Sequence, residues 1–388
     1  MIKILKKVIG WIRDAWLILG VTLALLLFIE LLSSIRFRIP GYDSRADADT
    51  YHHADWTTEY FKEGKASFEV GWASYVYWRQ KPFHGRYINV DAEGIRKTWH
   101  PESVPGRNVP RSRVFFFGGS TTWGIGARDE FTIPSITARL LWQKGVSAQV
   151  TNFGQIGYVS TQELIALLLE LQKGNVPDVV VFYDGINDTF SALQQQIAGL
   201  PQNEYKRVRE FNSSSKTISI FADNLSSIRF LQRLIQRLTV RHPTETRVPV
   251  LAPIGQNSPV TDLESVSKGV VDVYERNIAA VRTLAHRYGF KAVFYWQPNL
   301  FGKTHLTQYE GREFRKRSAM KPFFGLTCQL VKQRRLNQGG ETGFHDLSGI
   351  FSDTNEPLFV DWCHMGETGN GFVAEQIAGD IESTLAGK

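Results

Sequence analysis

From about Arg113 to the C-terminus, short apolar runs alternate with amphipathic stretches, and this rhythm predicts the core of the fold. The apolar runs have the length of buried strands; they are Val114–Phe117, Ala148–Val150, Pro177–Tyr183 and Ala292–Gln297. The amphipathic stretches have helical spacing; they are Phe131–Gln143, Ser160–Gln172, Val270–Tyr288 and Gly366–Leu385. Such alternation implies a parallel sheet covered on both faces. We therefore predict an α/β fold, a three-layer α/β/α sandwich of about five parallel strands with right-handed crossovers.

Four short polar motifs stand at or near the ends of these apolar runs. Gly118-Gly119-Ser120 follows the first run, Asn152-Phe-Gly-Gln-Ile-Gly157 the second and Asp184-Gly-Ile-Asn-Asp188 the third. Asp361-Trp-Cys-His364 follows Phe359-Val360 near the C-terminus. Open α/β sheets bind their ligands at the carboxyl ends of the strands. The sequence therefore predicts that these four motifs meet at one edge of the sheet.

The residue types in the motifs suit nucleophilic catalysis. A serine hydroxyl is a weak nucleophile until a neighbouring base takes its proton, so Ser120 needs a partner. His364 is the candidate base, and Asp361 is the candidate group that fixes its tautomer and stabilises the imidazolium. The three-residue separation brings Asp361 and His364 together if this segment makes a helical turn.

Serine, glycine, asparagine and Asp-x-x-His in this order resemble the SGNH hydrolases, the GDSL lipase/esterase superfamily. The resemblance extends from about Arg113 to the C-terminus and implies a flavodoxin-like sandwich with esterase chemistry. The common Gly-Asp-Ser reads Gly118-Gly119-Ser120 here, which keeps the nucleophile and weakens the case for a lipase. The Gly-x-Ser-x-Gly elbow of the α/β-hydrolases is absent, because Thr122 stands at the position of its second glycine.

The resemblance also implies an oxyanion hole, a set of donors that converge on the tetrahedral intermediate. These donors are the backbone N–H of Ser120, the backbone N–H of Gly157 and the side-chain amide of Asn187. Gly154 is the alternative to Gly157, and the six-residue spacing from Asn152 favours Gly157.

Residues 1–40 are predicted to lie outside the globular fold. Ala15–Ile35 is an apolar run long enough to span a bilayer. Basic residues precede it and favour a cytoplasmic N-terminus, although Arg36 and Arg38 follow it; the preceding ones are Lys3, Lys6, Lys7 and Arg13. A cleaved signal peptide is one alternative, but the run is long and no small-x-small cleavage site follows Ile35; a buried core helix is another. We expect a cytoplasmic tail and a single-pass signal anchor in the cell membrane, with the enzyme domain outside the cytoplasm.

Residues 41–111 are predicted to form an aromatic-rich cap and connector in front of a hydrolase domain at 112–388. The segment has too many large rings for a free linker: Trp56, Tyr60, Phe61, Trp72, Tyr75, Tyr77, Trp78 and Trp99. Tyr87–Arg96 has the pattern of strand, turn and strand, and Pro101–Pro110 that of a connector. We expect these rings to serve mainly in packing, with stacking on sugar rings as the alternative.

An insertion at residues 189–260 interrupts the alternation of strands and helices. It contains an amphipathic stretch, Ile220–Leu238, with Arg229, Arg233 and Arg237 on one face. Because the insertion leaves the sheet just after Asn187, it can overhang the site. A solvated face on a packing helix is the favoured interpretation, and binding of anionic lipid or acidic polysaccharide is the alternative.

Composition and charge narrow the functional classes. A net charge of +7 is modest for 388 residues, and no nucleic-acid-binding signature is present. Cys328 and Cys363 have no metal-site spacing, although a single bridge between them is compatible with the sequence. Cys363 is expected to pack as a small apolar residue rather than to act as a nucleophile. The histidines show no metal-ligand spacing, and His52-His53 is expected at the surface. We therefore expect no metal and no cofactor.

The leading interpretation is a membrane-anchored serine esterase that removes or transfers a small acyl group, most naturally acetyl, on an extracytoplasmic glycan. A lipid esterase or phospholipase-type hydrolase is the alternative. A non-catalytic glycan-binding or assembly protein is disfavoured, because every predicted catalytic and oxyanion position is filled. The sequence leaves the substrate, the oligomeric state and the choice between hydrolysis and transfer open.

Overall fold

The structure, a computed structural model, describes residues 2–38, 43–101, 112–212, 262–336 and 343–386. The chain divides into two compact units, one comprising Met1–Gly41 and Val208–Glu245 and the other Tyr42–Arg207 and Thr246–Lys388. The predicted amphipathic stretch Ile220–Leu238 and nearly all of the predicted connector Pro101–Pro110 lie outside the described residues.

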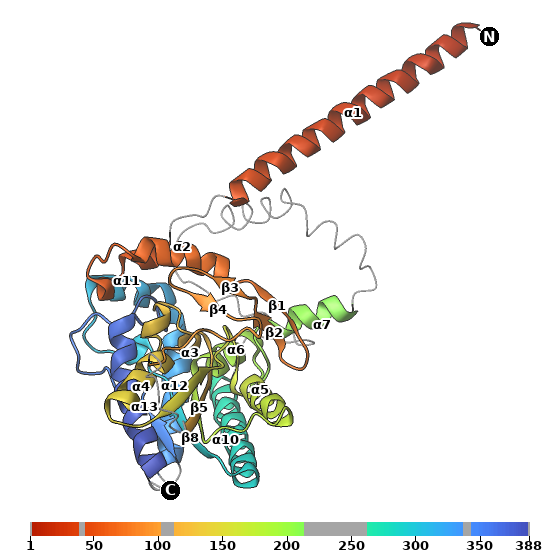
Figure 1. Ribbon diagram of the computed structural model, residues 1–388. Coiled ribbons are helices and arrows are strands. Elements are labelled where there is room, and N and C mark those ends of the chain that lie inside the picture. Colours follow the sequence, from red (N-terminus) through yellow and green to blue (C-terminus); the bar gives the residue numbers. More distant parts are fainter. Residues whose placement is uncertain (1, 39–42, 102–111, 213–261, 337–342, 387–388) are drawn as a thin grey trace. The chain divides into compact units, whose positions relative to one another are not determined.

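The larger unit is built on a five-stranded parallel sheet with the order β6-β5-β7-β8-β9 (Figure 1). The strands are β5 (Ser112–Gly118), β6 (Ala148–Asn152), β7 (Val179–Asp184), β8 (Lys291–Trp296) and β9 (Phe344–Asp346). The central strand β7 is buried along its whole length, which is why its sequence is a continuous apolar run. The predicted fold class is confirmed.

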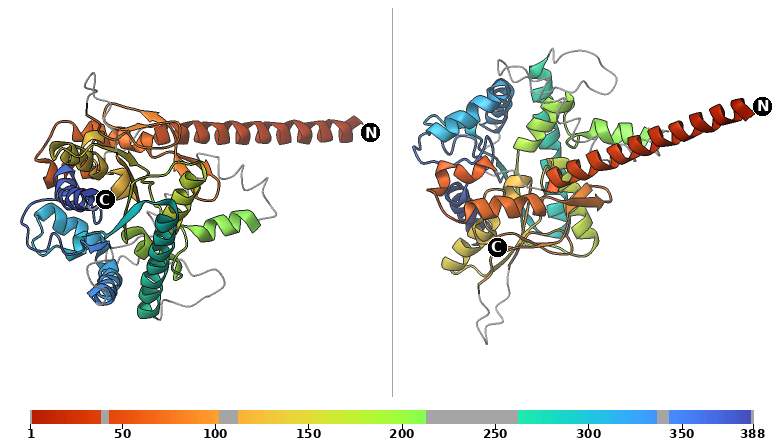
Figure 2. Two further views of the ribbon diagram at one scale, coloured as in Figure 1. Left: turned by 60° about the horizontal axis from the view of Figure 1, so that its bottom comes forward. Right: turned by 90° about the horizontal axis from the view of Figure 1, so that it is seen from above.

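Helices cover both faces of the sheet, because successive strand side chains point to opposite sides. Phe115 and Phe117 of β5 pack in one cluster with α5, α6, α10 and α12, whereas Val114 and Phe116 pack in the other with α4 and α13. Figure 2 shows α4 beside the dark blue α13 and away from the teal α10. The helices are α4 (Ile133–Gln143), α5 (Ser160–Gln172), α6 (Ile186–Gln195), α10 (Leu263–Tyr288), α12 (Lys321–Leu336) and α13 (Glu367–Ala386).

The segment before the sheet forms a third, aromatic cluster over the loop that follows β5. Its elements are η1 (Ser44–Asp47), η2 (Asp49–Tyr51), α2 (Thr57–Ser67), β1 (Val70–Ala73), β2 (Tyr77–Gln80), β3 (Phe83–His84) and β4 (Asn89–Val90). Tyr51 and Tyr60 are buried in this cluster with Trp123. The Tyr51 hydroxyl donates to the carbonyl of Gly126, and the Tyr60 hydroxyl accepts from the N–H of Gly126. The segment therefore packs directly on the chain that leaves Ser120.

The smaller unit contains α1 (Ile2–Arg38). Its stretch Lys6–Leu32 is long and apolar enough to cross a membrane, by length and composition. A signal sequence near an N-terminus meets the same criterion.

The remaining described helices are short. They are α3 (Ser120–Trp123), η3 (Asp129–Phe131), α7 (Glu204–Asn212), η4 (Leu300–Gly302), α11 (Gln308–Arg317) and η5 (Ser318–Met320).

One predicted helix start agrees with the structure and one is displaced. The helix predicted within Phe131–Gln143, with its start near Pro134, begins at Ile133, where Thr132 caps it by accepting a hydrogen bond from the N–H of Ser135. The helix predicted from Val270 begins at Leu263, where the Asp262 carboxylate accepts from the N–H of Ser265.

Candidate active site

Ser120 lies at the turn between the central sheet and a one-turn helix. Strand β5 ends at Gly118, Gly119 precedes α3 in an extended conformation, and Ser120 is the first residue of that helix. The first N–H groups of a helix have no acceptor within the helix, so the backbone N–H of Ser120 can donate to a group outside it. Ser120 is partly exposed, whereas Gly119 and Thr121 beside it are buried. The Ser120 hydroxyl is therefore accessible to solvent, although the residues on either side of it are buried.

Ser120, His364 and Asp361 form one chain of hydrogen bonds. Ser120 Oγ lies 2.7 Å from His364 Nε2. On the other side of the ring, His364 Nδ1 lies 2.8 Å from Asp361 Oδ2 and 3.0 Å from Asp361 Oδ1. With Nδ1 protonated and held by the carboxylate, Nε2 is free to accept the serine proton.

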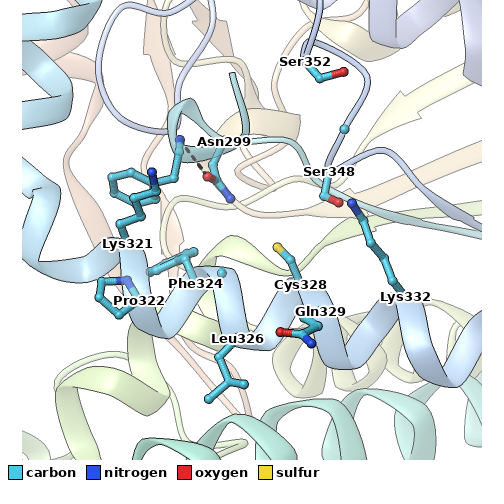
Figure 3. Close-up of a pocket in the computed structure, with 14 residues that line it drawn as sticks. Asn299, Lys321, Pro322, Phe324, Leu326, Cys328, Gln329, Lys332, Ser348 and Ser352 are labelled. Carbon is cyan, nitrogen blue, oxygen red and sulfur yellow. Dashed lines mark hydrogen bonds between the residues drawn. The ribbon is translucent and has the colours of Figure 1, made fainter. Parts of the chain in front are cut away.

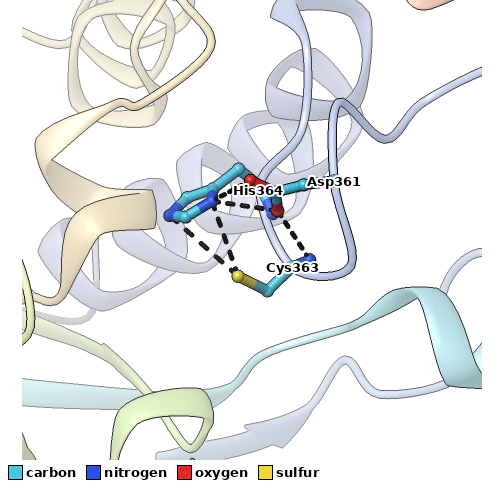
Figure 4. Close-up of side chains that lie close together, drawn as sticks. All are labelled: Asp361, Cys363 and His364. Atoms are coloured by element: carbon cyan, nitrogen blue, oxygen red, sulfur yellow. Dashed lines mark hydrogen bonds and ion pairs between the residues drawn. The ribbon is translucent and has the colours of Figure 1, made fainter. Parts of the chain in front are cut away.

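The Asp361–His364 segment is a bend and not the helical turn expected from the spacing. Asp361 Oδ1 accepts the backbone N–H groups of Cys363 at 3.0 Å and His364 at 2.8 Å, so the side chain itself folds the segment back (Figure 4). An antiparallel bridge between Phe359 and Met365 closes the base of the loop, which lies outside the parallel sheet. The three-residue separation thus brings carboxylate and imidazole together through an aspartate turn.

The environment of Asp361 keeps it ionised. Burial alone would raise its pKa, but the charge of His364 and the hydrogen bonds from His364 and Cys363 outweigh burial and hold the pKa well below its usual value. Arg45 of η1 lies with Nη1 3.6 Å from Asp361 Oδ2. Arg45 is itself held by Asp43, at 2.9 Å. The segment before the sheet thus supplies a cation next to the carboxylate, which no sequence motif indicated.

Cys363 lies beside His364 without the properties of a nucleophile. Its Sγ is 3.5 Å from His364 Nδ1, but burial, and next the charge of Asp361, raise its pKa well above the ordinary thiol value. Asp361, Cys363 and His364 also form a cluster whose ligand atoms converge closely enough for a metal ion. A metal would need the thiolate, which burial disfavours, and the imidazole nitrogens that already contact Asp361 and Ser120. Cys328 and Cys363 are both free, so they form no bridge.

Asn187 approaches Ser120 from the neighbouring strand. It follows Gly185, which has φ +112° and connects β7 to α6. Its Nδ2 donates to the Tyr158 carbonyl at 2.7 Å, and its Oδ1 accepts from Gln202 Nε2 at 3.0 Å. A Cβ at position 119 would lie 2.1 Å from Nδ2, so the amide rests directly on Gly119. One Nδ2 hydrogen serves Tyr158, so the amide has a second N–H to donate.

The two candidate glycines of the second motif have different environments. Gly154 is buried, and a Cβ there would lie 2.5 Å from the backbone N of Trp123, so this glycine serves close packing against α3. Gly157 is partly exposed with φ +82°, and a Cβ there would lie 3.6 Å from Trp78 and 3.5 Å from Gln202. Gly157 therefore keeps its place as the predicted oxyanion donor.

A buried network behind the site fixes these loops. Asp188 accepts from the hydroxyl of Ser160 at 2.6 Å and from its N–H at 3.1 Å, which ties the start of α5 to α6. Gln297, at the end of β8, donates to Thr121 Oγ1 at 2.7 Å and to the Tyr183 carbonyl. Gln297 is thus buried beneath the nucleophile turn.

A cavity of about 830 Å³ lies beside the Asp361–His364 loop, between α12 and the chain that follows β8 and β9 (Figure 3). Its walls include Phe301, Phe324 and Cys328, with Lys321 and Lys332 also lining it. Trp362 packs on Phe301 and Phe324, at ring distances of 6.0 and 5.3 Å. Phe301 and Gly302, which follow β8, thus line this cavity, and Trp362 connects it to the Asp361–His364 loop.

The fold and the site define the class of protein. A parallel sheet with a serine at the end of β5 and an Asp-x-x-His pair before the last helix is the arrangement of an SGNH-type hydrolase, which acts on ester bonds. The profile of the GDSL-like Lipase/Acylhydrolase family matches residues 114–377, more than half of the chain. The chain therefore belongs to this family.

Solved structures that match this chain include two carbohydrate esterases and a lipase/acylhydrolase. The family 3 carbohydrate esterase of Clostridium thermocellum is 15% identical, with 71% of this chain and 98% of that chain covered and a TM-score of 0.31. A variant of an acetyl-xylooligosaccharide esterase from Geobacillus Stearmophilus is 16% identical (71% and 96% covered, TM-score 0.35). The lipase/acylhydrolase from Enterococcus faecalis is 14% identical (70% and 96% covered, TM-score 0.34). No curated protein sequence matches this chain significantly.

Proposed function

We propose that this protein is a membrane-anchored serine esterase that removes, or transfers, a small acyl group on an extracytoplasmic glycan. The observation that carries the proposal is the hydrogen-bonded chain from Ser120 Oγ through His364 to Asp361. Ser120 is the nucleophile, His364 the general base and then acid, and Asp361 the group that orients the imidazole. The long helix α1, in which basic residues precede the apolar run Ala15–Ile35, supports the anchor and the extracytoplasmic location.

The proposed reaction follows from this geometry. Ser120 Oγ attacks the ester carbonyl as His364 Nε2 takes its proton, and the carbonyl oxygen becomes an oxyanion. The N–H groups of Ser120 and Gly157 and the amide of Asn187 stabilise that charge. The intermediate then expels the sugar oxygen, which takes the proton from His364 and leaves an acyl-serine. Water, or the hydroxyl of a second sugar, loses its proton to His364 as it attacks the acyl carbon. The second tetrahedral intermediate then expels Ser120 Oγ, which takes that proton back from His364.

The surroundings of Gly157 support a small acyl group. Trp78 and Gln202 both lie within 3.6 Å of the position that a Cβ of Gly157 would take, so these side chains form a wall at van der Waals distance beside the predicted oxyanion hole. An acetyl group needs little room there, whereas a long acyl chain needs an apolar channel.

A lipid esterase is the second candidate. It is supported by the cavity beside Trp362, whose aromatic walls and volume of about 830 Å³ suit an acyl chain. The residues that line the cavity do not include Ser120 or His364. A lipid substrate would therefore have to reach it past the Trp362 ring, which is why we rank this function second.

The proposal is tested by labelling the full-length protein in detergent with a fluorophosphonate, beside its Ser120→Ala variant. The expected result, by intact mass, is one adduct on the parent and none on the variant, because only a serine activated by a base reacts readily. Equal labelling of both proteins, or no labelling of folded parent protein, would contradict the proposed nucleophile. Comparing acetyl esters with longer acyl esters then separates the two candidates.

A further inference from the structure

The hairpin β1–β2 carries aromatic rings that the proposed chemistry does not use. Trp72 of β1 is the Cα partner of Trp78 of β2, so the two side chains lie on the same face of the hairpin. Trp72 is 76% exposed and Tyr75, in the turn, is 77% exposed. The hairpin precedes residue 114, where the family match begins. It is thus an addition to the family core with large rings left open to solvent.

The hairpin is held firmly against the loop that contains Gly157. Val76 in its turn is buried, and the Val76 carbonyl accepts from Gln162 Nε2 at 2.7 Å. Trp78 Nε1 donates to the Ile156 carbonyl at 2.8 Å. The edge of the Trp78 ring lies 3.6 Å from the position of a Cβ at Gly157. The aromatic face of the hairpin therefore starts at the predicted oxyanion hole.

From there, contacts lead without a break to the exposed rings. The Arg207 guanidinium lies over the Trp78 ring at 4.5 Å and over the Tyr77 ring at 4.9 Å. Arg207 Nη1 also donates to the carbonyl of Gln202, the residue that holds Asn187. The Tyr77 ring in turn lies 5.9 Å from the Trp72 ring. Trp78, Tyr77 and Trp72, with Tyr75 at the tip, form what we call the aromatic row.

The backbone of the hairpin is strained where it carries these rings. Tyr75 has φ +69° and Tyr77 has φ +72°. This left-handed region costs a residue with a Cβ about 1 kcal/mol or more, and glycine or asparagine usually occupies it. Consecutive strand side chains normally point to opposite faces, but the turn of the backbone at Tyr77 lets Tyr77 and Trp78 share one guanidinium. Because strained backbone positions cluster at functional sites, bulky rings at such positions indicate that the tyrosine side chains have a functional role.

We propose that the aromatic row binds successive sugar rings of the glycan whose acylated residue lies at Ser120. The inference rests on the proposed function and specifies its substrate as an oligosaccharide or polysaccharide rather than a small ester. A chain bound at the oxyanion hole leaves the site along Trp78 and then Trp72. The flat apolar faces of sugar rings stack on the exposed rings of Trp72 and Tyr75. Nearer the site, where Arg207 covers Trp78 and Tyr77, the sugar hydroxyls meet the polar groups of Gln202, Glu204 and Arg207.

The surroundings of the row fit a sugar better than a lipid. An acyl chain binds in an enclosed apolar channel, whereas Trp72 and Tyr75 stand open, with exposed Ser74 between them in the sequence. An anionic membrane surface would require a basic patch, but the charges of the hairpin are balanced. Lys81 pairs with Glu69 at 3.2 Å, and Arg79 lies 3.9 Å from Glu170.

The test measures binding without catalysis. Full-length Ser120→Ala protein in detergent is titrated by calorimetry with O-acetylated xylo-oligosaccharides and O-acetylated chito-oligosaccharides of increasing length. We expect affinity for at least one series to rise with chain length. Adding Trp72→Ala should lower the affinity for the longest chain about tenfold and leave that for the monosaccharide within about twofold. Tyr75→Ala should act in the same direction. Both side chains are exposed, so these variants keep the core intact, and circular dichroism checks their folding.

Trp142→Ala is the matched control, because Trp142 is an exposed tryptophan (38%) on α4, outside the aromatic row. Affinities independent of chain length in both series would overturn the proposal. So would a long-chain affinity that is unchanged in Trp72→Ala, or one that falls equally in Trp142→Ala. The fluorophosphonate result is separate: length-dependent binding through Trp72 in a protein that is never labelled would sink the proposed esterase function and leave the aromatic row standing.

Discussion

At the scale of single residues, the second glycine of Gly118-Gly119-Ser120 is explained by its neighbour on α6. A Cβ at position 119 would lie 2.1 Å from Asn187 Nδ2. Asn187 has little freedom to withdraw, since Tyr158 and Gln202 bind both ends of its amide. The aspartate that is common at this position would collide with that amide. The departure from Gly-Asp-Ser is therefore a consequence of how this chain holds its predicted oxyanion donor.

Replacement of Gly119 should impair the oxyanion hole without removing any of its donors. In Gly119→Ala the new methyl group displaces the Asn187 amide, and we expect kcat for p-nitrophenyl acetate to fall about 100-fold. Asn187→Ala should lose two to three orders of magnitude, roughly, for the same reason. If both changes act through one amide, the double variant is no slower than Asn187→Ala. Fully multiplicative losses would show that Gly119 acts by another route.

The same scale separates what the sequence predicts from what it does not. Ser120, Asn187 and His364 stand in short motifs whose residue types already indicate nucleophilic catalysis. Arg45 carries no such signal, because its role depends on a contact with Asp361, which is more than 300 positions away. The sequence brought Asp361 and His364 together on the condition of a helical turn. The structure has a turn closed by the aspartate side chain instead, which spacing alone does not distinguish from a helix.

At the scale of elements, the short helix α3 depends on a buried arginine from the preceding segment. A helix of one turn is not stable alone, and its last carbonyls need partners. Arg96 is fully buried; its guanidinium donates to the carbonyls of Trp123 at 3.1 Å, Gly124 at 2.7 Å and Ala127 at 2.7 Å. It also pairs with Asp129 at 3.0 Å. Arg96 thus fixes the end of the helix that begins with Ser120.

Arg96→Met should therefore destabilise the protein strongly. The change keeps an apolar stem but leaves Asp129 as a buried charge without its cation. It also removes the donor to the Ala127 carbonyl and one of the donors to each of the carbonyls of Trp123 and Gly124. We expect a loss of about 3–5 kcal/mol in the free energy of unfolding, read from urea denaturation. Arg86→Met is the control, because Arg86 is 72% exposed and its ion pair with Glu59 should contribute less than about 1 kcal/mol. Similar losses in both variants would contradict a special role for Arg96.

The bounds of a helix or strand were predictable where the sequence contains both a periodic hydrophobic pattern and residues that mark where the pattern starts and stops. Helix α5 has the predicted bounds Ser160–Gln172. Strand β9, Phe344–Asp346, was not predicted, since a run this short has no detectable period and is stabilised by its pairing with β8. The hairpin β1–β2 was also missed, because its two strained tyrosines replace the glycine and asparagine residues that mark tight turns.

At the scale of the whole molecule, three carboxyl groups are buried beneath the site and couple folding to pH. Burial, followed by the charges and hydrogen bond of its acidic neighbours, raises the pKa of Glu163 well above its ordinary value. Burial also raises the pKa of Asp184, to about 7, and that of Asp188. These groups come from α5, the end of β7 and α6, so they join the elements that carry Gly157 and Asn187. The protonation state of these three carboxyl groups therefore affects the folding stability of the larger unit.

The sign of the effect follows from these shifts. In the unfolded chain these groups lose their protons near pH 4, whereas the folded protein still holds them, so each rise in pH favours the unfolded state. Stability should therefore fall from about pH 4 to about pH 7, by about 1.4 kcal/mol for each unit by which a pKa is raised. Asp361 and Asp43 have lowered pKa values, so their contribution is lost only below this window. Glu163→Gln should flatten the fall in melting temperature over this same window, about pH 4 to about pH 7, whereas Glu382→Gln, at an exposed ion pair, should leave it unchanged. Equal slopes in parent and Glu163→Gln protein would mean that Glu163 is ionised in the fold.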